Sequence, residues 1–462
     1  MTNVRDFGAV GDGISKDTAA IQQAIDAGGI VYFPPGTYLA GTLYLRSHGG
    51  LDLAPGAVLK ASPDPADYNA AEFCPQNRAS TMERASGGHF IVAVEQHHLV
   101  IRGGGRIDGN RAAWLHEADP KNPVWYQWTW RPSQMLFFCE CQDLWISDVE
   151  LVDAPYWTCF LHGCQQVTLR GLHIYGDRMV PNNDGIDIDC CQQVTISDCV
   201  INSADDCITL RGNPDPLQTA RPCEYVAVSN CVLASGYANA IRIGVGDGVI
   251  RHCTFNNMII HDTRTAICVV CKYNPKRGVG TDISDISCAN FQLDVQRPFN
   301  IKLDNAAGFA EPSPRSIRRM YFSQMRGQAE LSNYIHGNGV GCVDDIRFHD
   351  LAFTYRGEGP RPDRDNKGNW GRSSTHAVFD VAYAKNIAFE QVRVPAGQRL
   401  GERRLVVAEA LGQLESAARR AAEAEILRTA TEDGILEQAQ KNAETYLLSL
   451  LNSLGFSRVV FE

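Results

Sequence analysis

The 462-residue sequence has no run of about 18 consecutive apolar residues and no apolar segment behind Met1 of the kind that forms an export signal. It also has no excess of positive charge, because 43 Lys and Arg stand against 53 Asp and Glu for a net charge of −10. A global field that attracts nucleic acid or an anionic membrane is therefore excluded. We expect a cytoplasmic protein with neither kind of partner.

Proline and glycine together account for only 62 of the 462 residues, and no collagen-like or low-complexity tract occurs. Cysteine, in contrast, is abundant at 16 residues. In a long chain without an export signal, so many cysteines argue against a disulfide scaffold. We expect reduced thiols that serve as small buried packing residues.

One pattern recurs along the middle of the chain: apolar, any, apolar, two residues, apolar, any, apolar. Successive copies start 23 to 41 residues apart, which is too irregular for a helical solenoid of fixed repeat length. The copies are Leu144/Ile146/Val149/Leu151, Val167/Leu169/Leu172/Ile174, Val194/Ile196/Cys199/Ile201, Val226/Val228/Cys231/Leu233, Cys253/Phe255/Met258/Ile260, Ile286/Cys288/Phe291/Leu293, Ile346/Phe348/Leu351/Phe353 and Ile387/Phe389/Val392/Val394, with a degenerate copy at Met320/Phe322/Met325.

Each copy predicts two short strands joined by a bend, because apolar residues alternate with period two on either side of the break. The residue before the third apolar position is of a type that tolerates the left-handed αL conformation, at Asp148, Gly171, Asp198, Asn230, Asn257, Asn290 and Asp350. We therefore predict an all-β fold, a right-handed parallel β-helix in which coils stack about 4.8 Å apart. Cys199 and Cys231 then occupy the same inward position of consecutive coils.

Two consecutive coils carry carboxylates. Aligning Ile186 with Ile208 puts Asp184 beside Asp206 and Asn183 beside Asp205. Like charges so close cannot all ionise freely, so at least one pKa rises and an acid becomes available near neutral pH. Hydrolysis of a glycosidic bond needs that combination of protonated and ionised carboxyl groups. A set of Asx turns or a calcium site is the alternative.

Several segments resemble the polygalacturonases, glycoside hydrolase family 28. The resemblance runs from Asp6 to about Val394, and its most specific motifs are Asn182-Asn183-Asp184-Gly185-Ile186-Asp187 and Asp205-Asp206. Further matches are Asp17–Asp26, Phe33–Tyr38, Arg131–Met135 and Ala154–Trp157. The resemblance implies a pectin-lyase-like right-handed β-helix that hydrolyses a pectin-related oligosaccharide or polysaccharide without a metal or other cofactor.

The resemblance also implies roles for the aspartates. Asp205 would be the general acid, and Asp184 with Asp206 would hold and activate the attacking water. The family's mechanism is inverting, for which we expect about 6.5–9.5 Å between acid and base; a shorter separation favours retention.

Two family motifs are missing. Asn239 stands where the family has a histidine, and Cys268-Val269-Val270 stands where it has Arg-Ile-Lys. When the outward positions of successive coils are aligned, Arg242 lies one coil before the missing arginine and in line with Asp187. In the same alignment, Arg211 is in line with Asp189 and Val270. Arg242 either binds a substrate carboxylate or forms a surface ion pair with Asp187 or its neighbours. The candidate substrate-binding residues are Asn182, Asp187, Arg211, Tyr237, Asn239 and Arg242.

Other features have structural or functional interpretations. The aromatic segment from Trp114 to Trp130 either stacks on sugar rings or plugs the coil. Cys268 and Cys271 sit on opposite faces of a strand, which argues against a zinc site. His162 is interpreted as a surface residue or a substrate contact. The long loops at 111–133 and 213–222 could close one end of a cleft and so favour exo action.

After Val394 the pattern changes to alanine, glutamate and helically spaced leucine. We predict a β-helix domain over residues 1–395 and an α-helical extension over 396–462. Within it, the stretch from Ala421 to Phe456 resembles the C-terminal end of a bacterial family of unknown function. It either covers the last coil, whose open edge would invite association, or mediates oligomerisation; the sequence indicates no particular oligomeric state.

Two other function classes compete with hydrolysis. A catalytically silent β-helix that binds glycans or builds a surface fibre would not need the three aspartates. A polysaccharide lyase on the same fold would need a calcium cage and a basic proton abstractor, for which the sequence shows no clear pair.

Overall fold

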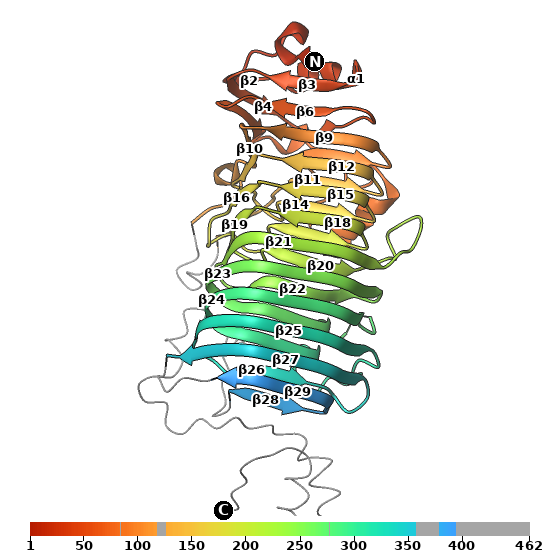
Figure 1. The fold of residues 1–462 in the computed structure, drawn as a ribbon. Coiled ribbons are helices and arrows are strands. Elements are labelled where there is room, and N and C mark those ends of the chain that lie inside the picture. Colours follow the sequence, from red (N-terminus) through yellow and green to blue (C-terminus); the bar gives the residue numbers. More distant parts are fainter. Residues whose placement is uncertain (84, 118–125, 277, 357–377, 394–462) are drawn as a thin grey trace, which may run out of the picture.

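The computed structural model describes residues 1–83, 85–117, 126–276, 278–356 and 378–393. The chain winds into an elongated stack of coils, with the N-terminus at one end, and every pairing between its named strands is parallel (Figure 1). Parallel neighbours joined by a turn of the coil form three sheets that run along the stack. The predicted right-handed parallel β-helix is confirmed.

The short strands divide among the three sheets. Sheet 1 contains β1 (Thr2–Asn3), β3 (Ile30–Phe33), β6 (Gly50–Leu53), β9 (His97–Gly103), β12 (Gln142–Ser147), β15 (Gln165–Arg170) and β18 (Gln192–Ser197). Sheet 2 contains β2 (Asp12–Lys16), β4 (Gly36–Ala40), β7 (Ala57–Ala61), β10 (Arg106–Asp108), β13 (Glu150–Val152), β16 (His173–Tyr175) and β19 (Val200–Ser203). Sheet 3 contains β5 (Leu43–Tyr44), β8 (Ile91–Val94), β11 (Leu136–Cys139), β14 (Cys159–His162), β17 (Ile186–Asp189), β20 (Ile208–Gly212), β22 (Asn239–Gly246), β26 (Asn333–His336) and β28 (Phe379–Ala382).

Later strands are longer and run around the corners between sheets. They are β21 (Cys223–Ser235), β23 (Val249–Lys272), β24 (Asp282–Asp304), β25 (Ser316–Ala329), β27 (Cys342–Tyr355) and β29 (Ala384–Arg393). β23 pairs with β21 in sheets 1 and 2 and with β22 in sheet 3, so one strand follows a whole coil.

The apolar repeat is the register of sheet 1. Val167 pairs with Val194, which pairs with Val226, and the column continues through Cys253 and Ile286. All seven residues expected to tolerate αL have a positive φ, between 50° and 62°. The bend between sheets 1 and 2 is therefore built as the sequence predicts.

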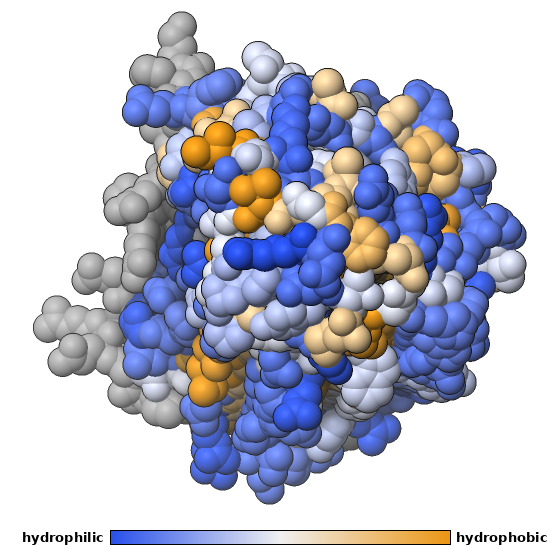
Figure 2. All heavy atoms as spheres, turned by 90° about the horizontal axis from the view of Figure 1, so that it is seen from above, coloured by the Kyte–Doolittle hydropathy of each residue, from blue (hydrophilic) through white to orange (hydrophobic). Residues whose placement is uncertain are grey.

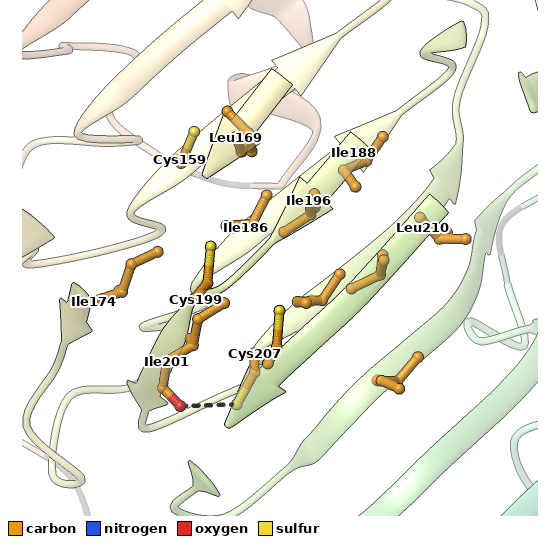
Figure 3. Close-up of a cluster of buried hydrophobic side chains, with 14 of the residues drawn as sticks. Cys159, Leu169, Ile174, Ile186, Ile188, Ile196, Cys199, Ile201, Cys207 and Leu210 are labelled. Carbon is orange, nitrogen blue, oxygen red and sulfur yellow. Dashed lines mark hydrogen bonds between the residues drawn. The ribbon is translucent and has the colours of Figure 1, made fainter. Parts of the chain in front are cut away.

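The core is one continuous cluster along the axis of the stack, made of the inward-facing side chains. Figure 3 shows its middle part, where Cys199 and Cys207 lie among the isoleucines of neighbouring coils. All 16 cysteines are free thiols and 14 of them are buried, which confirms their predicted packing role. Cys141, Cys164, Cys191 and Cys223 follow one another in adjacent coils, a thiol column that the repeat did not reveal.

Short helices close the N-terminal end and line the side of the stack. The helix α1 (Thr18–Asp26) buries Ile21, Ala24 and Ile25 against the first coils. Seen from this end, the surface is mostly hydrophilic, with separate apolar spots (Figure 2). The remaining helices are η1 (Val4–Phe7), η2 (Pro65–Asp67), η3 (Pro75–Asn77), α2 (Arg78–Met82) and η4 (Arg111–Ala113). None of the described helices is long and apolar enough to cross a membrane.

The predicted helical extension over 396–462 lies outside the described residues, as does Trp125 of the aromatic segment. The boundary between the two predicted domains therefore stays a prediction, with β29 ending at Arg393.

The αL column predicts a specific loss of stability. Asn257 has φ 57°, donates from Nδ2 to Asn230 Oδ1 at 2.7 Å and accepts from Asn290 Nδ2 at 3.1 Å. Asn257→Val should lower the free energy of unfolding by about 1–3 kcal/mol, because a β-branched residue is strained in αL and the amide ladder is cut. Urea unfolding measures this, with Thr254→Val on the same strand as the matched control. Equal stability of the two variants would contradict the interpretation.

Candidate active site

The two carboxylate-bearing coils meet on sheet 3, where β17 lies against β20. Ile186 pairs with Ile208 and Ile188 with Leu210, as the alignment predicts. Since alternate residues face opposite sides of a strand, Asp187, Thr209 and Arg211 then point away from the core on the outer face of the sheet. The corner just before these strands carries Asp184 on one coil and Asp205–Asp206 on the next.

Asp184, Asp205 and Asp206, here called the aspartate trio, converge at this corner. One carboxylate oxygen of each lies within 4.8 Å of one oxygen of each of the others. Gly185 allows this approach, because a Cβ at that position would lie 2.4 Å from the carbonyl oxygen of Cys207 and 2.7 Å from Ile201 Cγ2. Measured between nearest oxygens, the expected separation of 6.5–9.5 Å is not met.

Burial and the charges of neighbouring carboxylates raise the pKa values of Asp184 and Asp205. The pKa of Asp184 is raised well above its ordinary value, first by burial and then by the charges of Asp205, Asp187 and Asp206. The pKa of Asp205 is raised to about 6 by burial and by Asp206. Asp205 is half-buried, whereas Asp184 and Asp206 are 5% and 7% exposed. Asp205 is therefore the accessible acid of the trio.

Asn239, at the position of the family's histidine, holds Asp206. Its backbone N–H and its Nδ2 donate to Asp206 Oδ1 at 3.0 and 2.6 Å, and the residue is 2% exposed. The structure thus places Asn239 as a positioning group for the carboxylate, a role that sequence reasoning missed. Tyr237 lies half-buried on the same corner, where its backbone N–H donates to the Ala204 carbonyl oxygen.

Arg131 anchors the segment that precedes Asp184. Its guanidinium donates to the carbonyl oxygens of Pro155 and Pro181, both at 2.7 Å, and to Asn182 Oδ1 at 3.2 Å. The same group lies over the Trp128 ring, 4.0 Å from its centroid. Asn182 is therefore bonded to the protein, and Arg131, the first residue of one of the segments that resemble the family, holds this part of the site in place.

Arg211 is engaged by carboxylates of the protein. It pairs with Glu83, lies 3.4 Å from Asp189 and 4.0 Å from Asp187, and stacks over the Trp157 ring. Glu83 was absent from the sequence-based candidates, because it lies 128 residues upstream on a loop and has no motif around it.

Arg242 is different, because its charge has no carboxylate partner among the described residues. The side chain is 7% exposed, its Nε and Nη2 lack hydrogen-bond partners, and its guanidinium carbon lies 4.8 Å from the centre of the Tyr273 ring. Both oxygens of the fully buried Asp187 also lack hydrogen-bond partners. The alternative of a surface ion pair between Arg242 and Asp187 is therefore wrong for this structure.

Other candidate residues take structural places. His162 is fully buried and its Nε2 lies 2.9 Å from the Asn213 carbonyl oxygen, so its interpretation as a surface residue is wrong. Trp114 and Leu115 are buried in a small apolar cluster against which Trp130 packs, which favours the plug interpretation for that part of the aromatic segment. Trp128 remains 40% exposed beside Arg131.

The aspartate trio could also hold a cation, since its carboxylate oxygens lie within 4.8 Å of one another. Calcium, however, takes six to eight oxygen ligands. Here Asp206 already accepts two hydrogen bonds from Asn239, and the guanidinium of Arg211 contributes positive charge to Asp184. These contacts favour a cluster of acids over a calcium cage.

The trio predicts a conflict between stability and activity. A carboxyl group whose pKa is higher in the folded than in the unfolded state makes the folded protein less stable as the pH rises above the group's unfolded-state pKa near 4. Asp184→Asn should therefore stabilise the protein at pH 7, on the order of 1 kcal/mol, with little difference near pH 3. Thermal unfolding at both pH values measures this against the exposed control Asp215→Asn. A less stable Asp184→Asn at pH 7 would overturn the interpretation.

The sequence matches two family models in the β-helix and one beyond it. Residues 67–223 match glycosyl hydrolases family 28, and residues 1–44 match the rhamnogalacturonase A/epimerase, pectate lyase-like family. Residues 398–461 match a family of proteins of unknown function (DUF4230), the segment for which such a resemblance was expected.

Similar proteins carry polygalacturonase names. The chain is 28% identical to a probable polygalacturonase of Vitis vinifera, over 52% of this chain and 50% of that protein. It is 25% identical to the exo-poly-alpha-D-galacturonosidase of Dickeya chrysanthemi, over 56% of this chain and 50% of that protein. The chain thus spans about half the length of these two relatives.

Among solved structures, a hyperthermoactive exopolygalacturonase from Thermotoga maritima has the same fold. Its TM-score is 0.62 at 19% identity, over 85% of this chain and 92% of that one. The motif match is more specific than the fold, because residues 67–223 include the aspartate trio, Asp187 and Arg211. Through that segment, the chain resembles glycosyl hydrolases family 28.

Proposed function

We propose that this protein is a glycoside hydrolase that cleaves a pectin-related oligosaccharide or polysaccharide containing galacturonic acid or a similar uronic acid. The observation that carries the proposal is the aspartate trio, in which half-buried Asp205 has a pKa near 6 beside two more deeply buried carboxyl groups. The family match and the polygalacturonase names of its relatives support the same reaction.

In the proposed reaction, Asp205 starts protonated and donates its proton to the glycosidic oxygen as the bond to the anomeric carbon breaks. Water held by Asp184 and Asp206 attacks that carbon and gives up a proton to one of them. Asn239 keeps Asp206 oriented through its two hydrogen bonds to Oδ1. The products are two sugars with free hydroxyl groups, and no cofactor is consumed.

The proposed stereochemistry is inversion, as the family resemblance implies. The general rule for two carboxylates gives about 6.5–9.5 Å for inversion and about 5–5.5 Å for retention. The close nearest-oxygen distances here arise from three carboxylates at one corner. Two of them can share one water, so the rule for an isolated pair does not transfer directly. NMR of the first-formed anomer decides between the two outcomes.

The proposed substrate is anionic because positive charge lies beside the trio on the outer face of sheet 3. Arg242 is aligned one coil beyond Thr209, with two guanidinium nitrogens that lack partners. Lys302 lies further along the same sheet, where its Nζ contacts the Tyr334 ring at 4.5 Å. A uronate bound along the stack would meet the acids at one end and these cations beyond them.

The mechanism predicts the effect of Asp205→Asn. Activity on galacturonate oligosaccharides should fall by about 10²–10⁴-fold, because the variant cannot donate the proton, while oligosaccharide binding is retained. In the wild type, kcat/KM should decrease as the pH rises through about 6, since Asp205 must be protonated. An Asp205→Asn variant with undiminished activity would refute the assignment.

The proposed activity is tested by incubating the protein with a panel of pectic and neutral oligosaccharides. The products are followed by size and by NMR. Release of single sugars from chain ends would support the exo action suggested by the loops at 111–133 and 213–222, and mixed lengths would support endo action. An unsaturated, ultraviolet-absorbing product would instead indicate a lyase. Binding without any product would favour the silent glycan-binding module.

Arg242 predicts substrate specificity. Arg242→Ala should raise KM for substrates with free carboxylates by about 10–100-fold, the loss of one charge-assisted contact. Methyl-esterified substrates should be affected little, and Arg242→Lys should recover part of the loss. Arg251→Ala is the matched control, since Arg251 pairs with Glu224 elsewhere on the stack. Equal effects on free and esterified substrates would remove Arg242 from carboxylate recognition.

A further inference from the structure

A cluster of three histidines lies outside the site described above, near the N-terminal end of sheet 1. One ring nitrogen from each of His48, His97 and His98 lies within 4.8 Å of one from each of the others. All three side chains are exposed to solvent. We propose that these three imidazoles form a binding site for a divalent transition metal ion, with Zn²⁺ as the ion that their chemistry fits.

The fold brings the histidines together through a second column of αL residues. His48 and His98 have φ 60° and 53°, and Asp143 of the next coil has φ 57°. The strand pairings place these three positions one above another, about 4.8 Å apart. His97 precedes His98, and its carbonyl oxygen accepts the His48 backbone N–H at 2.9 Å.

The three rings lie close together. The centroids of His48 and His97 are 4.6 Å apart, those of His48 and His98 are 4.8 Å apart, and those of His97 and His98 are 5.1 Å apart. Tetrahedral zinc with Zn–N bonds of about 2.0–2.1 Å needs its nitrogens roughly 3.4 Å apart. Exposed side chains reach that spacing by small rotations, because the backbone positions are fixed by the coil stack.

An independent contact prepares one ring for metal binding. Asp143 Oδ2 is hydrogen-bonded to His98 Nδ1, which leaves Nε2 of His98 for the metal. A carboxylate on the far nitrogen of a histidine ligand fixes the tautomer and raises the basicity of the ligating nitrogen. Asp143 is thus a positioning residue for the proposed site.

Three protein ligands leave a fourth position for water, and the ligands would link two consecutive coils, with Asp143 on the next one. Its distance in sequence from the aspartate trio, and its place on a different sheet, separate it from the proposed hydrolase chemistry. Metal bound here would stabilise the N-terminal coils, because ligands that bind only the folded state shift the unfolding equilibrium.

The test is a titration of the full-length, metal-stripped protein with Co²⁺, followed by its visible absorption band, and with Zn²⁺ by calorimetry. We expect one site per chain with a dissociation constant below about 10 μM, and a rise of a few degrees in the unfolding temperature. His97→Gln and His48→Gln should abolish that site while circular dichroism and glycosidase activity stay unchanged. Asp143→Asn should weaken binding by about 10–100-fold.

The matched control is His252→Gln. His252 occupies the same αL column, at φ 54°, but stacks on Tyr225 instead of another histidine. The His252→Gln variant should bind metal as the wild type does. Absence of a one-to-one site in the wild type, or a site that survives both His97→Gln and His48→Gln, would overturn the proposal. Metal binding to one of the 16 thiols would give a site that survives both substitutions.

Discussion

The spacing between coils is the constraint from which the chemistry of this protein follows. Each strand lies about 4.8 Å from its parallel neighbour, and the apolar register that fixes Ile186 on Ile208 cannot slip without turning every inward side chain outward. Residues at one position of consecutive coils are therefore held at that distance whatever their charge. The core enforces the contact between Asp184 and Asp206, which the two carboxyl groups would not form by themselves.

The cost of that contact is distributed through the surrounding hydrogen bonds. Asp206 receives two donors from Asn239, while Arg211 faces Asp187 and Asp189 and is itself balanced by Glu83. Asp184 Oδ1 and both oxygens of Asp187 keep no such partner. Unsatisfied buried oxygens are expensive in an isolated protein. They are useful where a substrate or its attacking water supplies the missing donors.

The sequence predicted the parts of the fold that repeat. Inward positions such as Val194 and Val226 show the period of a strand, and Asp198, Asn230 and Asn257 mark the αL bend by their type. The second αL column escaped notice, because its members include His98, Gln193, Tyr225 and Arg319, which share no chemical type. A position that is defined by backbone conformation alone leaves no signal in composition.

The candidate site was predictable only where it lies on strands or at the corners directly before them. The register of the strands predicted which residues lie beside Asp184 and which residues align with Arg242, since both follow from strand pairing. The contacts of Arg131 and Glu83 come from loops, whose paths no periodicity describes. The apolar pattern also did not predict that the Asn239 side chain points toward Asp206. An amide at this corner can point either toward solvent or toward the carboxylate, and the pattern does not distinguish the two.

The position of Arg242 has a consequence for the proposed chemistry. It lies one coil, about 4.8 Å, closer to the aspartate trio than Cys268, the residue that replaces the family's arginine. A uronate carboxylate held by Arg242 would therefore lie nearer to Asp205 than one held at the Cys268 position. Its negative charge would by itself favour the protonated form of Asp205, and the guanidinium that binds it would offset that effect. Substrate binding and the protonation of the general acid are thus coupled through one arginine, whose guanidinium lies over the Tyr273 ring.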